Sequence, residues 1–325
     1  MADLALRGLG IIAVVGSLCA SSARADVGPP ELAVLPGLTG LAGVIAPSLE
    51  LSRGVPLPAP SPEAVLDDRV RAGRHWRLDT ARGAIHVWVP ADYDAATAAA
   101  VVLVHGYWVD VDEAWEAYRL PQQFALSGIN AMFIAPEAPA AKWEPLAWPS
   151  LSELVRTVGD SLEVAMPAQR LVAVGHSGAY RTLAVWLANP ALDTVILLDA
   201  VYAEYSFVPW VRLSTQHRLV NIVYETGRFS NYLHRQLPST RRVDGLPRDG
   251  LPDARILYVR TDIGHWQLIT DGVALPLALR AIGVAQLPSA PRELPLGLPP
   301  RCDSPLTMDW LARSPFGQRI IELAP

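Results

Sequence analysis

A short apolar run that ends in a glycine–serine turn constrains the fold of this chain more than any other feature. Residues 171–179 read Leu-Val-Ala-Val-Gly-His-Ser-Gly-Ala. An apolar run of this length, bounded by glycine, predicts a strand buried on both faces of a sheet. A helix-compatible stretch, residues 182–188, follows at once, so the link holds one sharp turn with Ser177 at its tip. Such a turn forces the serine towards positive φ, which requires small residues on either side of it.

This strand–turn–helix pattern resembles the nucleophile elbow of the α/β-hydrolase superfamily, whose signature is Gly-x-Ser-x-Gly. Ala179 stands where the second glycine is usual, and alanine is the mildest replacement. The resemblance extends over roughly residues 75–282 and implies an α/β fold with a serine nucleophile. The alternative is a buried strand end, rich in small residues, that has no chemistry.

The order of apolar and amphipathic segments supports the same fold class. Strands that alternate with helices of these lengths indicate a mostly parallel, doubly wound sheet covered on both faces. No long insertion follows Asp199, which argues against a large cap domain. Strands are predicted at residues 75–79, 84–89, 99–104, 129–134, 171–175, 194–199, 219–225 and 255–261, and helices at 113–127, 151–165, 182–188 and 266–282.

The first 25 residues have the pattern of a secretory signal peptide. Arg7 precedes an apolar run at residues 9–20, and Ala23-Arg24-Ala25 fits an A-x-A cleavage site. The apolar run is too short to span a bilayer stably. We therefore expect a periplasmic or secreted protein that is cleaved after Ala25 and has no transmembrane segment in its mature form.

The rest of the chain divides by composition into three parts. Residues 26–66 are rich in proline and glycine and predict an irregular arm, residues 67–286 the hydrolase domain, and residues 287–325 a proline-rich tail with a possible short helix at 308–323. Signal cleavage would remove Cys19 and leave one cysteine, which excludes an intramolecular disulfide. The net charge of −5, without a basic tract, argues against a nucleic-acid partner. Nothing in the sequence indicates the oligomeric state.

Sites in α/β sheets form at the carboxyl ends of the strands, so polar residues just after predicted strands are the candidates for chemistry. Ser177 follows one strand, and His265 follows the last strand in a loop that contains Gly264. A serine hydroxyl needs a neighbouring base to take its proton. His265 is the predicted base, because the family places its histidine there. His176 adjoins the serine, but at a sharp turn its side chain is expected to point away from the hydroxyl.

The sequence leaves the acid of the catalytic triad open between two residues. The family usually carries it in the loop after the strand predicted at 219–225, but residues 226–230 hold no carboxylate. Glu225 is the nearest acidic side chain. Asp199 ends the preceding strand, in a segment similar to that of some lipases that carry their acid there. We favour Asp199 and keep Glu225 as the alternative.

Two backbone N–H groups are candidates for the oxyanion hole that acyl transfer needs. Gly178 supplies one by its position after the nucleophile. The stretch His105-Gly106-Tyr107 resembles the family's His-Gly motif, and Tyr107 is the predicted second donor. The longer His-Gly-Gly-Gly version is absent.

Two further patterns have plain structural interpretations. The acidic run at residues 110–113 lacks the rest of a calcium loop and more simply begins a helix, where acidic side chains are favoured. We expect no metal and no cofactor. Four aromatic residues after the strand at 194–199 could line an acyl pocket or belong to the core, and the sequence favours neither: Tyr202, Tyr205, Phe207 and Trp210.

These patterns together predict an exported serine hydrolase, esterase- or lipase-like, that cleaves a small carboxylic ester or amide through an acyl-enzyme. A protein of the same fold that has lost catalysis and serves in binding or as a scaffold is the first alternative. A serine peptidase of the same fold is the second. The triad alone does not separate esters from peptides.

Overall fold

The computed structural model describes residues 61–247, 249–290 and 297–298. The predicted signal peptide, most of the predicted arm and the possible helix at 308–323 lie outside the described residues. In the described part of the chain, no helix is long and apolar enough to cross a membrane.

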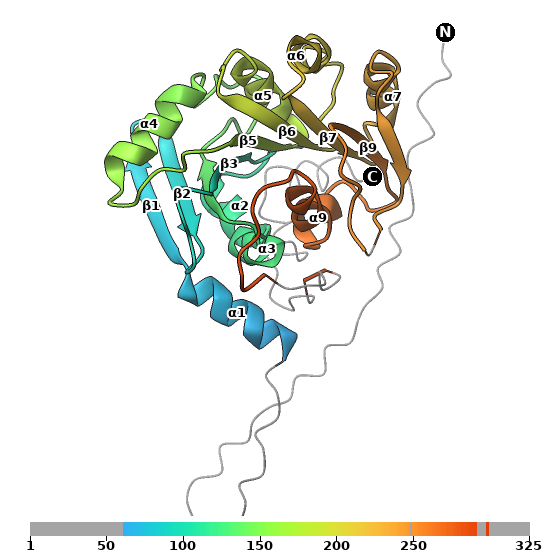
Figure 1. Ribbon diagram of the computed structural model, residues 1–325. Helices are drawn as coiled ribbons and strands as arrows, with labels where there is room; N and C mark the ends of the chain where they lie inside the picture. The colour runs from blue at the N-terminus through green and yellow to red at the C-terminus, as the bar shows by residue number, and fades with distance from the viewer. Residues whose placement is uncertain (1–60, 248, 291–296, 299–325) are drawn as a thin grey trace, which may run out of the picture. The chain divides into compact units, whose positions relative to one another are not determined.

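A nine-stranded sheet forms the centre of the domain (Figure 1). Its strands are β1 Arg74–Thr80, β2 Gly83–Val89, β3 Ala99–Val104, β4 Ala131–Pro136, β5 Leu171–His176, β6 Leu192–Leu198, β7 Arg218–Val223, β8 Arg241–Asp244 and β9 Ile256–Arg260. The strand order is β1-β2-β4-β3-β5-β6-β7-β9-β8. The pairs β1–β2 and β2–β4 are antiparallel, and the remaining pairs are parallel. This is the mostly parallel sheet of the α/β-hydrolase type, which confirms the predicted fold class.

Helices cover both faces of the sheet (Figure 1). One face packs against α1 Pro62–Ala72, α2 Val111–Ala117, α3 Leu120–Ser127, α8 Gln267–Thr270 and α9 Ala274–Arg280. The other face packs against α4 Leu151–Ser161, α5 Tyr180–Trp186, α6 Phe207–Leu213 and α7 Gly227–Arg235. Along the central strands, side chains alternate between the two cores. In β3, for example, Val101 belongs to the first core and Val102 to the second.

Two predictions of single long helices are wrong. The helix predicted at 113–127 is divided into α2 and α3, with Arg119 between them in the left-handed region at φ 52°. Pro121 lies in the first turn of α3 and cannot continue a helix from the residues before it, because proline lacks an N–H and its ring clashes with the preceding turn. The helix predicted at 266–282 is likewise divided into α8 and α9, and Gly272 between them has φ 70°.

Three further elements differ from the sequence-based expectations. Helix α1 begins inside the segment predicted to be an irregular arm, with the Ser61 side chain accepting a hydrogen bond from the backbone of Ala64 and with Leu66 buried in the core. The edge strand β8 was not predicted, because its four residues are polar and largely exposed and carry no apolar alternation. Helix α4 ends at Ser161, before the end of the segment predicted to be helical.

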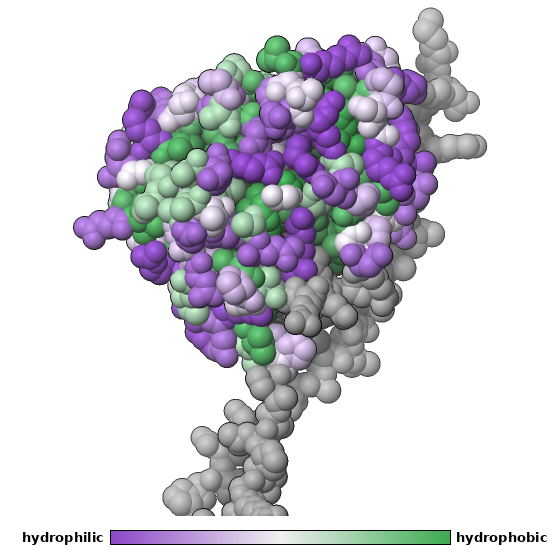
Figure 2. All heavy atoms as spheres, viewed as in Figure 1, coloured by the Kyte–Doolittle hydropathy of each residue, from purple (hydrophilic) through white to green (hydrophobic). Residues whose placement is uncertain are grey.

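The visible surface mixes hydrophilic and hydrophobic residues (Figure 2). In the described part of the chain the large apolar side chains that are exposed are Val65, Trp143, Val185, Leu213, Tyr224 and Tyr232.

Truncating a leucine of the second core should destabilise the fold strongly. Leu154 of α4 is fully buried, so Leu154→Ala removes packed methyl groups and leaves a cavity. We expect the free energy of unfolding to fall by about 2–5 kcal/mol in urea denaturation. Leu213→Ala is the matched control: Leu213 is 80% exposed, and the change should alter stability by less than ~0.5 kcal/mol. Equal losses in the two variants would contradict this assignment of the core.

Candidate active site

The predicted nucleophile turn is present. Ser177 follows β5 and has φ 51°, in the left-handed region that a sharp strand-to-helix turn imposes. A short 3-10 turn, η1 Ser177–Ala179, leads directly into α5. A side-chain carbon on Gly175 would lie 2.9 Å from Leu183 Cδ2 and 3.0 Å from Ala179 Cβ. A larger residue at position 175 would therefore displace Leu183 and disturb the packing of α5 on the strand, whereas the methyl group of Ala179 is accommodated in the core.

Asp199 and His265 are joined by a hydrogen bond across 66 residues of sequence. Asp199 follows β6, has φ 48° and is fully buried. His265 follows β9, and its Nδ1 lies 2.7 Å from Asp199 Oδ2. Four further donors bind the carboxylate: the backbone N–H of Tyr224 at 3.1 Å, of Glu225 at 3.0 Å and of Thr226 at 2.8 Å, and the Thr226 hydroxyl at 2.7 Å.

These hydrogen bonds decide the charge of the pair. Burial alone would raise the pKa of Asp199, but the hydrogen bonds from His265 and Thr226 outweigh it and hold that pKa well below its usual range. Asp199 is therefore ionised and accepts the hydrogen of His265 Nδ1. The other ring nitrogen, Nε2, is left without a proton in the neutral imidazole and is free to act as a base.

The carboxylate of Glu225, the second candidate acid, is not the one that bonds His265. Its backbone N–H donates to Asp199, and its side chain is exposed at the edge of the cavity. Asp199, Glu225 and His265 each offer a ligand atom within 4.8 Å of the others. A metal ion held by all three would compete with the hydrogen bond between Asp199 and His265.

A cavity of about 460 Å³ contains the predicted nucleophile and base together. Tyr202, which the sequence left between pocket and core, lines this cavity, and burial raises its pKa to about 12, so its hydroxyl stays protonated. Phe207 and Trp210 belong to the core instead. The cavity is lined by Tyr107, Trp108, Lys142, Ser177, Gly178, Tyr180, Tyr202, Glu225, His265 and Trp266.

The loop after β3 packs against the nucleophile turn. A side-chain carbon on Gly106 would lie 3.0 Å from Ser177 Cβ, and one on Gly178 would lie 2.6 Å from the ring of Tyr107. Glycine at both positions therefore lets the two loops approach this closely without displacing the Tyr107 ring or Ser177. His105 ties the loop after β3 to the segment after β4, because its Nε2 accepts a hydrogen bond from the Ala138 N–H at 3.1 Å.

His176 is a buried residue of the site whose contacts sequence reasoning missed. Its side chain is fully buried, and its Nε2–H donates to the carbonyl oxygen of His265 at 3.0 Å. The rings of His176 and His265 have centroids 4.7 Å apart. Burial, followed by the nearby charge of His265, lowers the pKa of His176 to about 3. The one signal in the sequence was its position directly before the serine.

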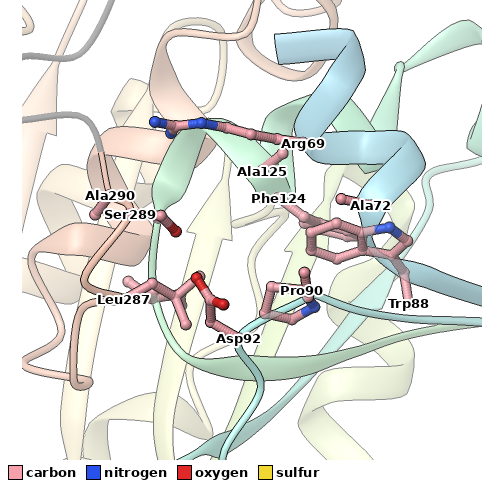
Figure 3. Close-up of a pocket in the computed structure, with 13 residues that line it drawn as sticks. Arg69, Ala72, Trp88, Pro90, Asp92, Phe124, Ala125, Leu287, Ser289 and Ala290 are labelled. Atoms are coloured by element: carbon pink, nitrogen blue, oxygen red, sulfur yellow. The ribbon is translucent and has the colours of Figure 1, made fainter. Parts of the chain in front are cut away.

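A second cavity, of about 180 Å³, shares none of its lining residues with this site; Figure 3 shows it in close-up. It is mostly apolar, with Trp88 and Phe124 in its wall, and Arg69 and Asp92 reach it from different sides. Its lining includes residues from the end of β2 and from the start of the segment that leads into β4. It contains no histidine, so it offers no acid–base chemistry of the kind found beside Ser177.

No protein-family model and no curated protein sequence matches this chain. Several solved structures have a similar backbone. A feruloyl esterase module from Clostridium thermocellum is 12% identical over 69% of this chain and 91% of its own, with a TM-score of 0.47. A thermostable esterase from Pseudomonas putida ECU1011 is 14% identical over 68% and 87%, with a TM-score of 0.41. An S-formylglutathione hydrolase from Agrobacterium tumefaciens is 12% identical over 66% and 95%, with a TM-score of 0.40.

These similarities do not assign an activity to this chain. Its own features identify the fold. The sheet is parallel from β4 to β8, and the two pairs before it, β1–β2 and β2–β4, are antiparallel. Helices cover both faces, and Ser177 occupies a left-handed turn between β5 and α5. A hydrogen-bonded acid and histidine follow β6 and β9, in the chain order serine, acid, histidine. The chain has the α/β-hydrolase fold.

Proposed function

We propose that this protein is a serine hydrolase that cleaves carboxylic esters through an acyl-enzyme, with Ser177 as nucleophile, His265 as base and Asp199 as the acid of the triad. The observation that carries the proposal is the 2.7 Å hydrogen bond from His265 Nδ1 to the buried Asp199, beside the cavity that His265 lines with Ser177. Glu225, the alternative acid, supports the triad through its backbone N–H rather than through its carboxylate.

The chemistry follows from the protonation states. His265 Nε2 takes the proton of the Ser177 hydroxyl as the serine oxygen attacks the ester carbonyl carbon. The negative charge that develops on the carbonyl oxygen is stabilised by the backbone N–H groups of Gly178 and Tyr107. His265, now an imidazolium stabilised by Asp199, gives its proton to the departing alcohol, and an ester of Ser177 remains. Water, activated by the same histidine, then releases the acid and restores the serine.

The cavity favours a small substrate with an apolar or aromatic acyl group. Its wall is rich in aromatic side chains, and such pockets bind apolar groups with a few polar groups for orientation. The segment between β6 and β7 holds one short helix, α6, so it contributes no large lid over the site. We expect short and medium acyl esters to be hydrolysed without interfacial activation.

The paired acid and histidine support an enzyme over the alternative of a non-catalytic binding protein. A fluorophosphonate probe tests this choice directly, because it labels a serine only when that serine is activated. Labelling of Ser177 is expected, and an unlabelled wild-type protein would favour the binding protein. A panel of p-nitrophenyl esters and peptides, run on the same sample, then separates esterase from peptidase activity.

Ser177 and His265 should behave as one unit in mutagenesis. The serine is inert without its base, and the base has nothing to activate without the serine, so losing either should cost nearly as much as losing both. The measurement is kcat/KM for Ser177→Ala, His265→Ala and the double variant on one p-nitrophenyl ester across a range of pH. Additive losses, or full activity in Ser177→Ala, would mean that the turn is only architectural.

The identity of the acid has its own test. Asp199→Asn keeps the size of the side chain but removes the charge that orients and stabilises His265, so kcat should fall by roughly 10⁴-fold. Glu225→Gln is the matched control and should be mild, because its backbone N–H, which bonds Asp199, is retained. The reverse pattern would move the acid to Glu225, and two mild results would leave the triad without either candidate.

We also propose that the protein is exported, on the sequence pattern of residues 1–25. N-terminal sequencing of the protein from its native host should begin at Asp26. Ala25→Leu should block this cleavage, because the processing site requires a small residue there. A mature protein that begins at Met1 would contradict export with cleavage.

A further inference from the structure

His176 is placed where the three loops of the proposed catalytic site meet. It is joined to Ser177 by the chain itself. Its Nε2–H donates to the His265 carbonyl at 3.0 Å. A side-chain carbon on Gly106 would lie 3.1 Å from its Nδ1, so the loop that carries Tyr107 passes directly against the imidazole. Each of these loops follows a different strand, β5, β9 and β3 respectively.

The protonation state of His176 is fixed by its surroundings. A carbonyl oxygen can only accept, so Nε2 carries the hydrogen. Nδ1 is buried and has no hydrogen-bond partner among the described residues. If Nδ1 were also protonated, no group there would accept its hydrogen. Desolvation therefore disfavours the charged form, and the imidazole stays neutral when His265 becomes an imidazolium during the reaction.

We propose that His176 is a positioning residue, a neutral hydrogen-bond donor that fixes the backbone of His265 relative to Ser177 and to the loop of Tyr107. The proposal rests on the proposed function, because it concerns the alignment of that same triad. His265 is held at two points, at its side chain by Asp199 and at its carbonyl by His176. Without the hydrogen bond from His176, the backbone of His265 would be free to shift while its imidazole stays bonded to Asp199.

The expected consequence is a loss of alignment rather than of binding. Proton transfer from serine to histidine requires the reacting atoms to lie within hydrogen-bonding distance. A misplacement of about 1 Å can cost roughly 100-fold in rate. His176 does not line the cavity, so its loss should change kcat and leave KM nearly unaltered.

Two substitutions separate the hydrogen bond from the packing of the ring. His176→Gln loses the ring but can place an amide N–H near the position of imidazole Nε2. His176→Phe keeps a ring of similar size and removes the donor. We expect kcat to fall about 10- to 100-fold in His176→Phe and to be largely retained in His176→Gln.

His234→Phe is the matched control for the loss of a buried neutral histidine. His234 in α7 is buried, its pKa is also lowered to about 3 by burial, and its ring stacks on Tyr258. Its side chain hydrogen-bonds Asn221 and Thr240, and neither residue belongs to the loops after β3, β5 and β9. Its replacement should lower the melting temperature without lowering kcat. A similar drop of kcat in His234→Phe would mean that destabilisation explains the His176 result.

A readout that needs no ester keeps the inference separate from the proposed function. The His265 Nδ1 proton, bonded to Asp199, can be followed by NMR in the wild type and in both variants. We expect its resonance to be shifted or broadened by exchange in His176→Phe and retained in His176→Gln. Unchanged resonance and kcat in His176→Phe, or equal damage in both variants, would overturn the inference. A wild type that hydrolyses no ester and binds no fluorophosphonate would instead overturn the proposed function, with the NMR comparison still deciding the role of His176.

Discussion

The buried carboxylate of Asp199 is the group on which the rest of the site depends. Its five hydrogen bonds come from the loops after β7 and β9, so a single side chain joins the carboxyl ends of three strands. Removing a charge from water is costly unless hydrogen bonds replace the lost hydration, and here five donors do so. The donors are at the same time the reason that the carboxylate is ionised. One set of contacts therefore both joins the loops and orients His265, the proposed base.

Strained backbone surrounds this group. Ser177 and Asp199 follow adjacent parallel strands, and both have φ in the left-handed region. Such a conformation costs about 1–3 kcal/mol for each residue and persists only where the surroundings impose it. The contacts that do so are specific: α5 packs on Gly175, the loop of Tyr107 packs on Gly178, and the hydrogen bonds of the carboxylate hold Asp199. For the proposed reaction, groups that are already held in place in this way would need little reorganisation.

Local signals predicted the strands well and the helices less well. Each predicted strand begins and ends within two residues of the observed one, because an apolar run between turns leaves little freedom. The two long helices failed at Pro121 and Gly272, where amphipathic periodicity continues across a break in the backbone. Strand β8 has no apolar pattern of its own and exists because β9 offers it an edge to pair with. Periodicity reports which face is buried, and it does not report where the chain bends.

The sequence by itself determined the fold class, the turn at Ser177 and the histidine after the last strand, since each depends on residues adjacent in the chain. It left the acid open between Asp199 and Glu225, because both follow strands and both are carboxylates. Only the tertiary structure decided which of them bonds His265, since that bond joins residues far apart in sequence. The contacts of His176 were hidden for the same reason. Its partners are a backbone carbonyl after β9 and a glycine after β3, and no local pattern encodes the packing of three loops against one another.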